Sequence, residues 1–238
     1  MTKNFRDATI FYEFFDRKSE VVNVFLHGWG CDHQSLLFCQ ERLNKQSALF
    51  VDFPPFGRSS QHIKNWSIFT YANMVMSICQ HLKIKKINII GHSFGGRIGI
   101  ILAVLCKNEV QKLVLVDSAG LKPKRSLKFY FKVLAYKIRR KLGLDVSKYG
   151  SVDFRALDSD MREIFKSIVS THLDDFLPFI TAPTLIIFGK DDKTTPVYMA
   201  RKMKRKIKNS KLVLLEGAGH FSFVDRRLEF LSQLEKFV

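Results

Sequence analysis

Acidic residues are scarce in this sequence of 238 residues: 22 Asp and Glu accompany 39 Lys and Arg, which gives a formal net charge of +17. A charge of this size affects solubility and long-range attraction, but it does not specify a fold. Long apolar runs are missing too, because no segment is apolar over the roughly 18 residues that a membrane-spanning helix requires. We therefore expect no integral membrane span.

Signals for secretion, metal binding and nucleic-acid binding are also missing. The stretch MTKNFRDATIFYEFF has scattered charges and no apolar run before a cleavage site, which predicts a soluble, cytoplasmic protein. The four cysteines of the whole chain lack CxxC spacing and are expected to be buried free thiols. No His, Cys or carboxylate cluster has ligand spacing, and no nucleic-acid-binding pattern accompanies the charge. We expect no metal, no cofactor and no nucleic-acid partner.

What the chain does contain is enough apolar surface for one large core, with 46% hydrophobic residues and 22 Phe. Short apolar or β-branched runs recur along it and suit strands that are buried on both faces. These predicted strands are Val21–Leu26, Ala48–Val51, Ile87–Ile90, Leu113–Val116, Thr184–Phe188 and Leu212–Leu215. Upstream, Ala8–Phe15 is expected to add an antiparallel edge strand or hairpin.

Helical patterns lie between several of these strands and after the last one, namely Ser35–Asn44, Thr70–Leu82, Gly95–Cys106, Tyr198–Lys206 and Ser222–Phe237. Alternating strands and helices predict an α/β fold with a mostly parallel sheet flanked by helices. The alternation stops between about Leu121 and Ile180, where helical stretches follow one another. We therefore predict a core formed by residues 1–120 and 181–238, with a helical lid inserted at 121–180 after the sixth strand.

The most informative segment is INIIGHSFGG, in which a buried strand leads directly into Gly91, Ser93 and a helix. This GxSxG pattern is typical of a nucleophilic serine held on a sharp strand-to-helix turn, where glycines remove Cβ atoms that would collide. The helix that begins at Phe94 points its first backbone N–H groups toward negative charge that develops beside the serine. The pattern predicts Ser93 as a nucleophile.

A serine nucleophile needs a base, and the base needs an orienting acid. His220 is the predicted base, because GAGH follows the last predicted strand and the carboxyl ends of parallel strands carry catalytic residues. The acid is expected after Thr184–Phe188, where Asp191 and Asp192 are both compatible with the order serine, acid, histidine. Asp117 is the alternative acid, and otherwise a solvated loop carboxylate.

The segment HGWG follows the strand Val21–Leu26 and is a glycine-rich turn that allows close approach of the backbone to a substrate. The expected oxyanion hole consists of the backbone amides of Trp29 and Phe94. The Trp29 indole either lines the acyl pocket or only packs. The residues expected to contact substrate are His27, Gly28, Trp29, His92 and Phe131, although His27 and His92 also suit purely local hydrogen bonding.

Together, HGWG, DFPPFGRSS, GHSFGG, PTLIIFGKDD and GAGH resemble the α/β-hydrolase superfamily, in its small esterase branch. In that family the acid usually stands three residues beyond the glycine that ends its strand. Counting from Gly189, the resemblance implies Asp192 rather than Asp191. The chain departs from the family at Pro55, where relatives often carry glycine. HGWG and GHSFGG are also similar to those of carboxylesterases that act on pimeloyl-type methyl esters of acyl carrier protein.

The predicted lid is strongly basic, with nine Lys or Arg and no acid between Lys122 and Lys141. Helical spacing places Leu127, Phe131, Leu134, Ile138 and Leu142 on one face, and Lys128, Lys132 and Arg139 away from it. The basic face is either a solvated surface or a docking site for an acidic carrier protein or anionic lipid. A second basic run, Arg201–Lys211, has no interleaved aromatic residues.

These features predict a serine hydrolase that cleaves a small-molecule carboxylic ester through an acyl-enzyme on Ser93. The alternative is an acyl-carrier-protein ester or thioester hydrolase that docks through the basic lid. A noncatalytic ligand-binding protein with the same fold is the third hypothesis, and a peripheral membrane enzyme attracted by the positive charge is a further one.

Overall fold

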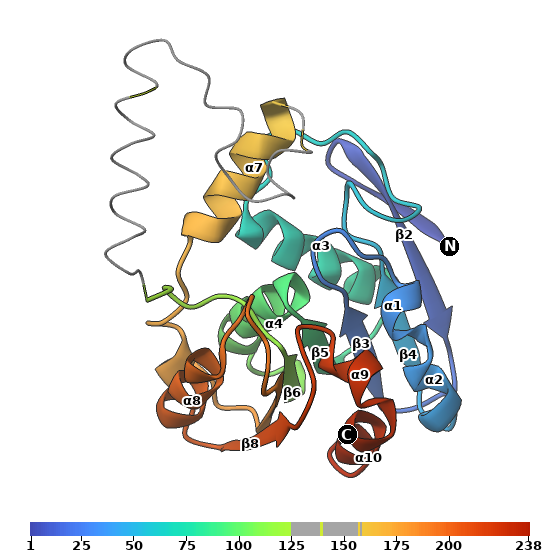
Figure 1. Cartoon of the computed structure of the whole chain (residues 1–238). Helices are drawn as coiled ribbons and strands as arrows, with labels where there is room; N and C mark the ends of the chain where they lie inside the picture. The colour runs from blue at the N-terminus through green and yellow to red at the C-terminus, as the bar shows by residue number, and fades with distance from the viewer. Residues whose placement is uncertain (125–138, 140–156, 158) are drawn as a thin grey trace.

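A computed structural model of the protein describes residues 1–124, 139, 157 and 159–238. Within this part of the chain, the strands form one eight-stranded sheet in the order β1-β2-β4-β3-β5-β6-β7-β8 (Figure 1). The strands are β1 (Thr2–Phe5), β2 (Ala8–Phe15), β3 (Val21–Leu26), β4 (Ala48–Val51), β5 (Lys86–His92), β6 (Val110–Val116), β7 (Thr184–Gly189) and β8 (Ser210–Leu215).

Every strand pair from β4 to β8 is parallel, whereas β1 pairs antiparallel with β2, and β2 pairs antiparallel with β4. The expected N-terminal hairpin is therefore confirmed. The predicted α/β-hydrolase architecture, a mostly parallel sheet flanked by helices, is confirmed as well. The predicted central strands are present, and β5, β6 and β8 begin earlier in the chain than their apolar runs indicate.

The helices are α1 (Gln34–Leu37), α2 (Cys39–Arg42), α3 (Ile68–His81), α4 (Phe94–Leu105), α7 (Ser159–Ser170), α8 (Val197–Lys206), α9 (Ser222–Asp225) and α10 (Arg227–Glu235), with a short 3-10 helix at Leu177–Phe179. Helix α3 begins with a capping box in which Ser67 and Thr70 exchange side-chain and backbone hydrogen bonds. Because of this cap, α3 begins at Ile68, two residues before the start at Thr70 that the apolar periodicity predicts.

Two predicted helices are each divided in two. The segment predicted as one helix at Ser35–Asn44 forms α1 and α2, and its backbone makes short-range bonds such as that from the Glu41 amide to the Phe38 carbonyl. The predicted C-terminal helix is interrupted at Arg226, whose φ of −128° and ψ of 50° are not helical. Periodicity cannot reveal such breaks, because the apolar residues on both sides still face the core.

The sheet separates two apolar clusters because alternate residues of a strand point to opposite faces. Val24 and Leu26 pack in the cluster that contains residues of α3, α4 and α8, whereas Phe25 packs in the cluster formed with α2 and α10. Figure 1 shows α1, α2, α9 and α10 grouped together on one side of the sheet. Both faces of the central strands are thus covered, as continuous apolar runs predict.

The predicted lid lies largely outside the described residues, and so do Phe131, Lys128 and Lys132. Its described part contains α7 and the 3-10 helix and no strand. The buried side chain of Arg97 on α4 connects this part to the core, since its Nη1 donates to the carbonyls of Ile168 at 2.7 Å and Thr171 at 2.8 Å. The boundaries of the lid remain a prediction.

All four cysteines are free thiols, but only Cys39 and Cys79 are buried. Cys31 and Cys106 are partly exposed, so the expectation of four buried thiols was wrong for these two. Across the described ranges, no helix combines the length and the apolar character needed to cross a membrane.

Candidate active site

Ser93 lies between the end of β5 and the start of α4, and it adopts φ 48° and ψ −105°, a conformation that non-glycine residues rarely take. The turn is possible because its neighbours lack side chains. A Cβ at Gly95 would lie 2.0 Å from the Leu26 carbonyl oxygen, and one at Gly91 would lie 2.5 Å from the Gly95 carbonyl oxygen. The sharp turn expected from GxSxG is therefore present, with the Ser93 side chain at its apex.

Three side chains from three strand ends form a hydrogen-bonded chain. His220 Nε2 lies 3.0 Å from Ser93 Oγ, and His220 Nδ1 lies 2.8 Å from Asp192 Oδ2. Ser93 follows β5, Asp192 follows β7 and His220 follows β8, so the parallel sheet brings residues separated by up to 127 positions to one edge. The structure thus brings together the three side chains that the sequence singles out.

The environment of Asp192 favours its ionised form. Burial alone would raise the pKa of this carboxyl, but hydrogen bonds from His220 and Thr195 outweigh burial and hold the pKa below its usual value. Oδ1 accepts from the amides of Thr194 at 2.7 Å and Thr195 at 2.9 Å. An ionised carboxylate can only accept, so Nδ1 of His220 carries the proton and Nε2 is free to accept from Ser93.

Thr195 is a site residue that the sequence analysis missed. Its hydroxyl donates to Asp192 Oδ2 at 2.6 Å, lies 3.0 Å from the Asp117 carbonyl oxygen and is 3.3 Å from His220 Nδ1. The only available signal is its position three residues after Asp192 in KDDKTTP, which is compatible with many loops. Its hydroxyl thus binds Oδ2 of the carboxylate, whereas its backbone amide donates to Oδ1.

The other two candidate acids do not contact His220 in the described structure. Asp191 is exposed, and its amide donates to the Ala218 carbonyl. Asp117 is buried rather than solvated, which corrects the expectation of a solvated loop carboxylate. Its Oδ1 accepts from the Gly189 amide at 2.7 Å, and burial raises its pKa to about 7.

The two amides expected to form an oxyanion hole lie on adjoining turns. The Gly95 amide donates to the His27 carbonyl at 3.0 Å, which joins the HGWG turn to the start of α4. A Cβ at Gly28 would lie 3.5 Å from Ser93 Cβ, so this turn passes directly beside the serine. Within the described residues, neither the Trp29 amide nor the Phe94 amide has a hydrogen-bond partner.

The two histidines beside the site are buried and neutral. His27 accepts at Nε2 from the Phe53 amide at 2.9 Å and donates from Nδ1 to the Gly28 carbonyl at 2.7 Å, and burial lowers its pKa to about 4. His92 donates from Nε2 to the His220 carbonyl at 2.9 Å, and burial lowers its pKa to about 3. These contacts use both ring nitrogens of His27 and leave His92 Nδ1 unpaired. His92 therefore positions the backbone of His220.

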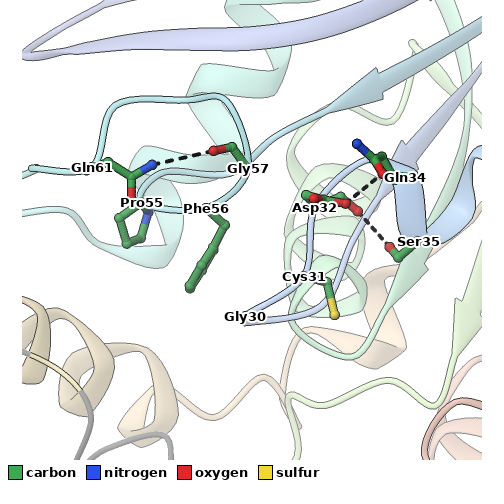
Figure 2. A pocket seen from close by; sticks show the side chains of 9 residues that line it. All are labelled: Gly30, Cys31, Asp32, Gln34, Ser35, Pro55, Phe56, Gly57 and Gln61. Carbon is green, nitrogen blue, oxygen red and sulfur yellow. Dashed lines mark hydrogen bonds between the residues drawn. The ribbon is translucent and has the colours of Figure 1, made fainter.

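Trp29 joins the site to a neighbouring cavity. Its ring contacts Phe94 at a centroid distance of 5.5 Å, Phe165 on α7 at 5.1 Å and Phe56 at 4.8 Å. Phe56 lines a cavity of about 590 Å³, which Ser93 and His220 do not line. Figure 2 shows Cys31 and Phe56 extending from two facing loops of this cavity. The lining residues are Gly30, Cys31, Asp32, Gln34, Ser35, Pro55, Phe56, Gly57 and Gln61.

The described residues contain no group of three or more His, Cys, Asp or Glu side chains that could hold a metal ion. The side chains that meet at this edge of the sheet with the geometry for proton transfer are those of Ser93, His220 and Asp192.

Comparison with known proteins places this geometry in a family. The sequence profile of the family described as alpha/beta hydrolase fold matches residues 24–135 and 123–227. The chain belongs to the α/β-hydrolase family. This α/β hydrolase is 26% identical over 255 residues to the AB hydrolase superfamily protein YisY of Bacillus subtilis, covering 90% of each chain. It is 25% identical over 256 residues to putative esterase/lipase 2 of Mycoplasma genitalium, covering 94% of each.

A solved structure of an esterase from Exiguobacterium antarcticum matches the α/β hydrolase with a TM-score of 0.76 and 25% identity. The match covers 96% of this chain and 95% of that chain. The likeness therefore extends over the whole sheet and its flanking helices rather than over a shared motif.

Proposed function

We propose that this α/β hydrolase is a serine hydrolase that cleaves carboxylic esters through an acyl-enzyme on Ser93. The observation that carries the proposal is the pair of contacts made by one imidazole, 3.0 Å to Ser93 Oγ and 2.8 Å to Asp192 Oδ2. A serine hydroxyl becomes a useful nucleophile when a base within hydrogen-bond reach accepts its proton. His220 is in that position, and Asp192 fixes its tautomer.

In the first half of the reaction, Ser93 Oγ attacks the carbonyl carbon of the ester while its proton moves to His220 Nε2. The carbonyl π electrons move to the oxygen and form a tetrahedral oxyanion. The intermediate collapses by breaking the bond to the alcohol oxygen, which takes the proton from His220 as it leaves. The acyl group remains bound to Ser93, and the ionised Asp192 stabilises the transient imidazolium.

In the second half, a water molecule replaces the alcohol. His220 accepts one of its protons while the water oxygen attacks the acyl carbon, and collapse of the second tetrahedral intermediate returns the proton to Ser93 Oγ. The products are a carboxylic acid and the free enzyme. The amides of Trp29 and Phe94 are the proposed donors to both oxyanions, because they are unpaired and lie on turns that adjoin at Ser93.

The relatives support an ester as substrate, since one curated relative is named a putative esterase/lipase and one solved structure is an esterase. An open depression of about 590 Å³ beside Trp29 leaves room for part of a small-molecule substrate next to the site.

The carrier-protein alternative depends on the basic segment between Lys122 and Lys141, most of which lies outside the described residues. The similarity to pimeloyl-type esterases is part of this alternative. Replacing Lys128, Lys132 and Arg139 with Glu tests it, because turnover of a carrier-linked ester should collapse while a soluble ester is still cleaved. Equal loss on both substrates would contradict carrier docking.

Hydrolysis of p-nitrophenyl esters of increasing acyl length tests the main proposal. Wild type should release p-nitrophenol with a preferred chain length, and Ser93→Ala should lose this activity. Ser170→Ala is the matched control, because this exposed serine on α7 is remote in sequence from the site. Activity that survives in Ser93→Ala at matched folding would overturn the assignment of the nucleophile, and an inactive wild type would favour a noncatalytic binding role.

A further inference from the structure

A second, half-open cavity lies where the segment that follows β6 meets helix α8, and five of its six lining residues are Lys or Arg, whose side-chain stems form most of its wall. It has a volume of about 310 Å³, and its lining residues are Lys122, Lys124, Tyr198, Arg201, Lys202 and Arg205. Figure 1 shows α8 beside the chain that leaves β6, and the Lys124 amide donates to Tyr198 Oη at 2.9 Å across this junction. The function proposed above makes no use of this cavity.

Helical spacing explains why the charges converge. Along α8, the cavity-lining residues Arg201, Lys202 and Arg205 follow Tyr198 by three, four and seven positions. All four side chains therefore lie on one face of the helix. Lys122 and Lys124 approach this face from the other side, and Lys124 Nζ lies 5.1 Å from the centre of the Tyr198 ring. Five cationic side chains thus line one small cavity.

Little negative charge balances them in the described part of the chain. Asp174 forms an ion pair with Lys202 and accepts a hydrogen bond from the Lys122 amide. Within the described residues, no carboxylate forms an ion pair with the exposed side chains of Arg201 and Arg205. Like charges held this close repel one another, so an anionic ligand would relieve a cost that the folded protein otherwise carries.

We propose that this cavity binds a phosphate group, either on a small phosphorylated molecule or in a lipid headgroup. Phosphate offers three or more acceptor oxygens, so it can accept from two guanidinium groups at once, whereas the two oxygens of a carboxylate are used up by one two-pronged pair. Tyr198 adds a neutral donor, because its oxygen accepts from the Lys124 amide while its own hydroxyl hydrogen remains to be donated. The half-open volume of about 310 Å³ leaves room for a phosphate group together with part of the molecule that carries it.

The cavity is also close to the candidate active site along the chain. Tyr198 is six residues after Asp192, and six extended residues span at most about 20 Å. Lys122 follows Asp117 by five residues, and Asp117 contacts the segments that carry Asp192 and His220. The binding itself does not depend on catalysis.

The test compares wild type with Arg201→Glu/Arg205→Glu, using the full chain and no activity readout. Lys45→Glu/Lys107→Glu is the matched control, since both lysines are exposed, remote from the cavity in sequence and produce the same change in net charge. Binding is measured by calorimetry with glycerol 3-phosphate and with glycerol, and by co-sedimentation with phosphatidylcholine vesicles that contain or lack phosphatidic acid. Circular dichroism verifies that each variant is folded.

Wild type should bind glycerol 3-phosphate and not glycerol, and the cavity variant should lose at least tenfold in affinity while the control keeps most of it. Binding to phosphatidic acid vesicles alone, with the same loss in the cavity variant, would identify a lipid headgroup as the source of the phosphate. The proposal is overturned if wild type binds neither probe, or if both variants weaken binding equally, because the effect would then reflect net charge only.

Discussion

The Ser222 amide donates a hydrogen bond to Asp117 Oδ2 at 3.0 Å, which connects the end of β6 to the segment that carries His220. The other oxygen of the same carboxyl accepts from Gly189 at the end of β7, three residues before Asp192. One buried carboxyl therefore holds the two loops that present the imidazole and its acidic partner. It acts through these loops and touches neither His220 nor Ser93.

Asp117→Asn should weaken both activity and stability. The amide group has only one oxygen, so its NH₂ would face either the Gly189 amide or the Ser222 amide and leave two donors opposed. Loss of one buried hydrogen bond costs about 1 to 3 kcal/mol, which the midpoint of urea unfolding should reveal. We expect kcat for a p-nitrophenyl ester to fall about tenfold, which corresponds to about 1.4 kcal/mol. Asp175→Asn, at a fully exposed side chain, should match wild type.

Asp192→Asn should abolish most activity, and Asp191→Asn should not. An asparagine at position 192 can donate to His220 Nδ1, which would move the imidazole proton to Nε2 and prevent it from accepting the Ser93 proton. In comparable triads this change lowers kcat by about 10⁴-fold. Steady-state kinetics of both variants measure the difference. A large loss in Asp191→Asn with an active Asp192→Asn would reverse the assignment of the acid.

Thr195→Val should lower kcat with little change in KM. The valine keeps the shape of threonine but removes the donor that lies 2.6 Å from Asp192 Oδ2. A hydrogen bond to a charged group contributes about 1.5 to 3 kcal/mol, so a loss of about tenfold or more is expected. Thr195→Ser retains the hydroxyl and should restore most of the activity. If serine is as damaging as valine, packing rather than the hydrogen bond is responsible.

Gly95→Ala should prevent the strand-to-helix turn from forming correctly. Its Cβ would lie 2.0 Å from the Leu26 carbonyl oxygen, which belongs to backbone and cannot move aside. Gly99→Ala, one turn further along α4, is the control. There the new Cβ meets the side chains of Ile89 and Leu113 at 3.1 Å, which can shift by a few tenths of an ångström. Thermal unfolding should show a fall in Tm for Gly95→Ala that clearly exceeds that for Gly99→Ala.

His92 should make the protein less stable as the pH falls. An unfolded histidine binds a proton below about pH 6.5, whereas burial lowers the pKa of folded His92 to about 3. Between these values the unfolded state holds one more proton, so the free energy of unfolding decreases by about 1.4 kcal/mol per pH unit as the pH falls. His92→Gln removes this contribution.

Urea unfolding near pH 5 and pH 7 measures the His92 effect. The loss of stability between the two should be about 2 kcal/mol smaller in His92→Gln than in wild type, because one proton-linked contribution is gone. His62→Gln, at an exposed histidine, is the control and should keep the wild-type slope. An unchanged slope in His92→Gln would show that His92 is not held neutral in the folded protein.

The central sheet and the identity of the three hydrogen-bonded side chains could be predicted from the sequence, because each depends on a local pattern. A buried strand followed by GHSFGG predicts the turn at Ser93, and GAGH after a strand predicts the place of His220. The choice of Asp192 over Asp191 needed the family resemblance, since adjacent carboxylates look alike in a sequence. Only the structure shows which of them is turned inward.

The contacts of Asp117 and Thr195 could not be predicted, because they depend on which loops meet at the sheet edge. Asp117 accepts from residues 72 and 105 positions away, and no local pattern encodes such a distance. The helical segments that form α1 with α2 and α9 with α10 were predicted, but the break within each of them was missed. Their apolar residues keep one periodicity through the break, so the spacing of apolar residues does not mark it.

The backbone conformation of Ser93 implies a conflict between robustness and reactivity. A non-glycine residue at φ 48° and ψ −105° costs about 1 to 3 kcal/mol relative to a relaxed one. Glycine would adopt the same turn more easily, so a Ser93→Gly protein should unfold at a higher temperature than the parent while losing the proposed nucleophile. Selection for heat resistance alone would thus favour an inactive variant. Stabilising substitutions in this protein should therefore be sought at residues away from the turn.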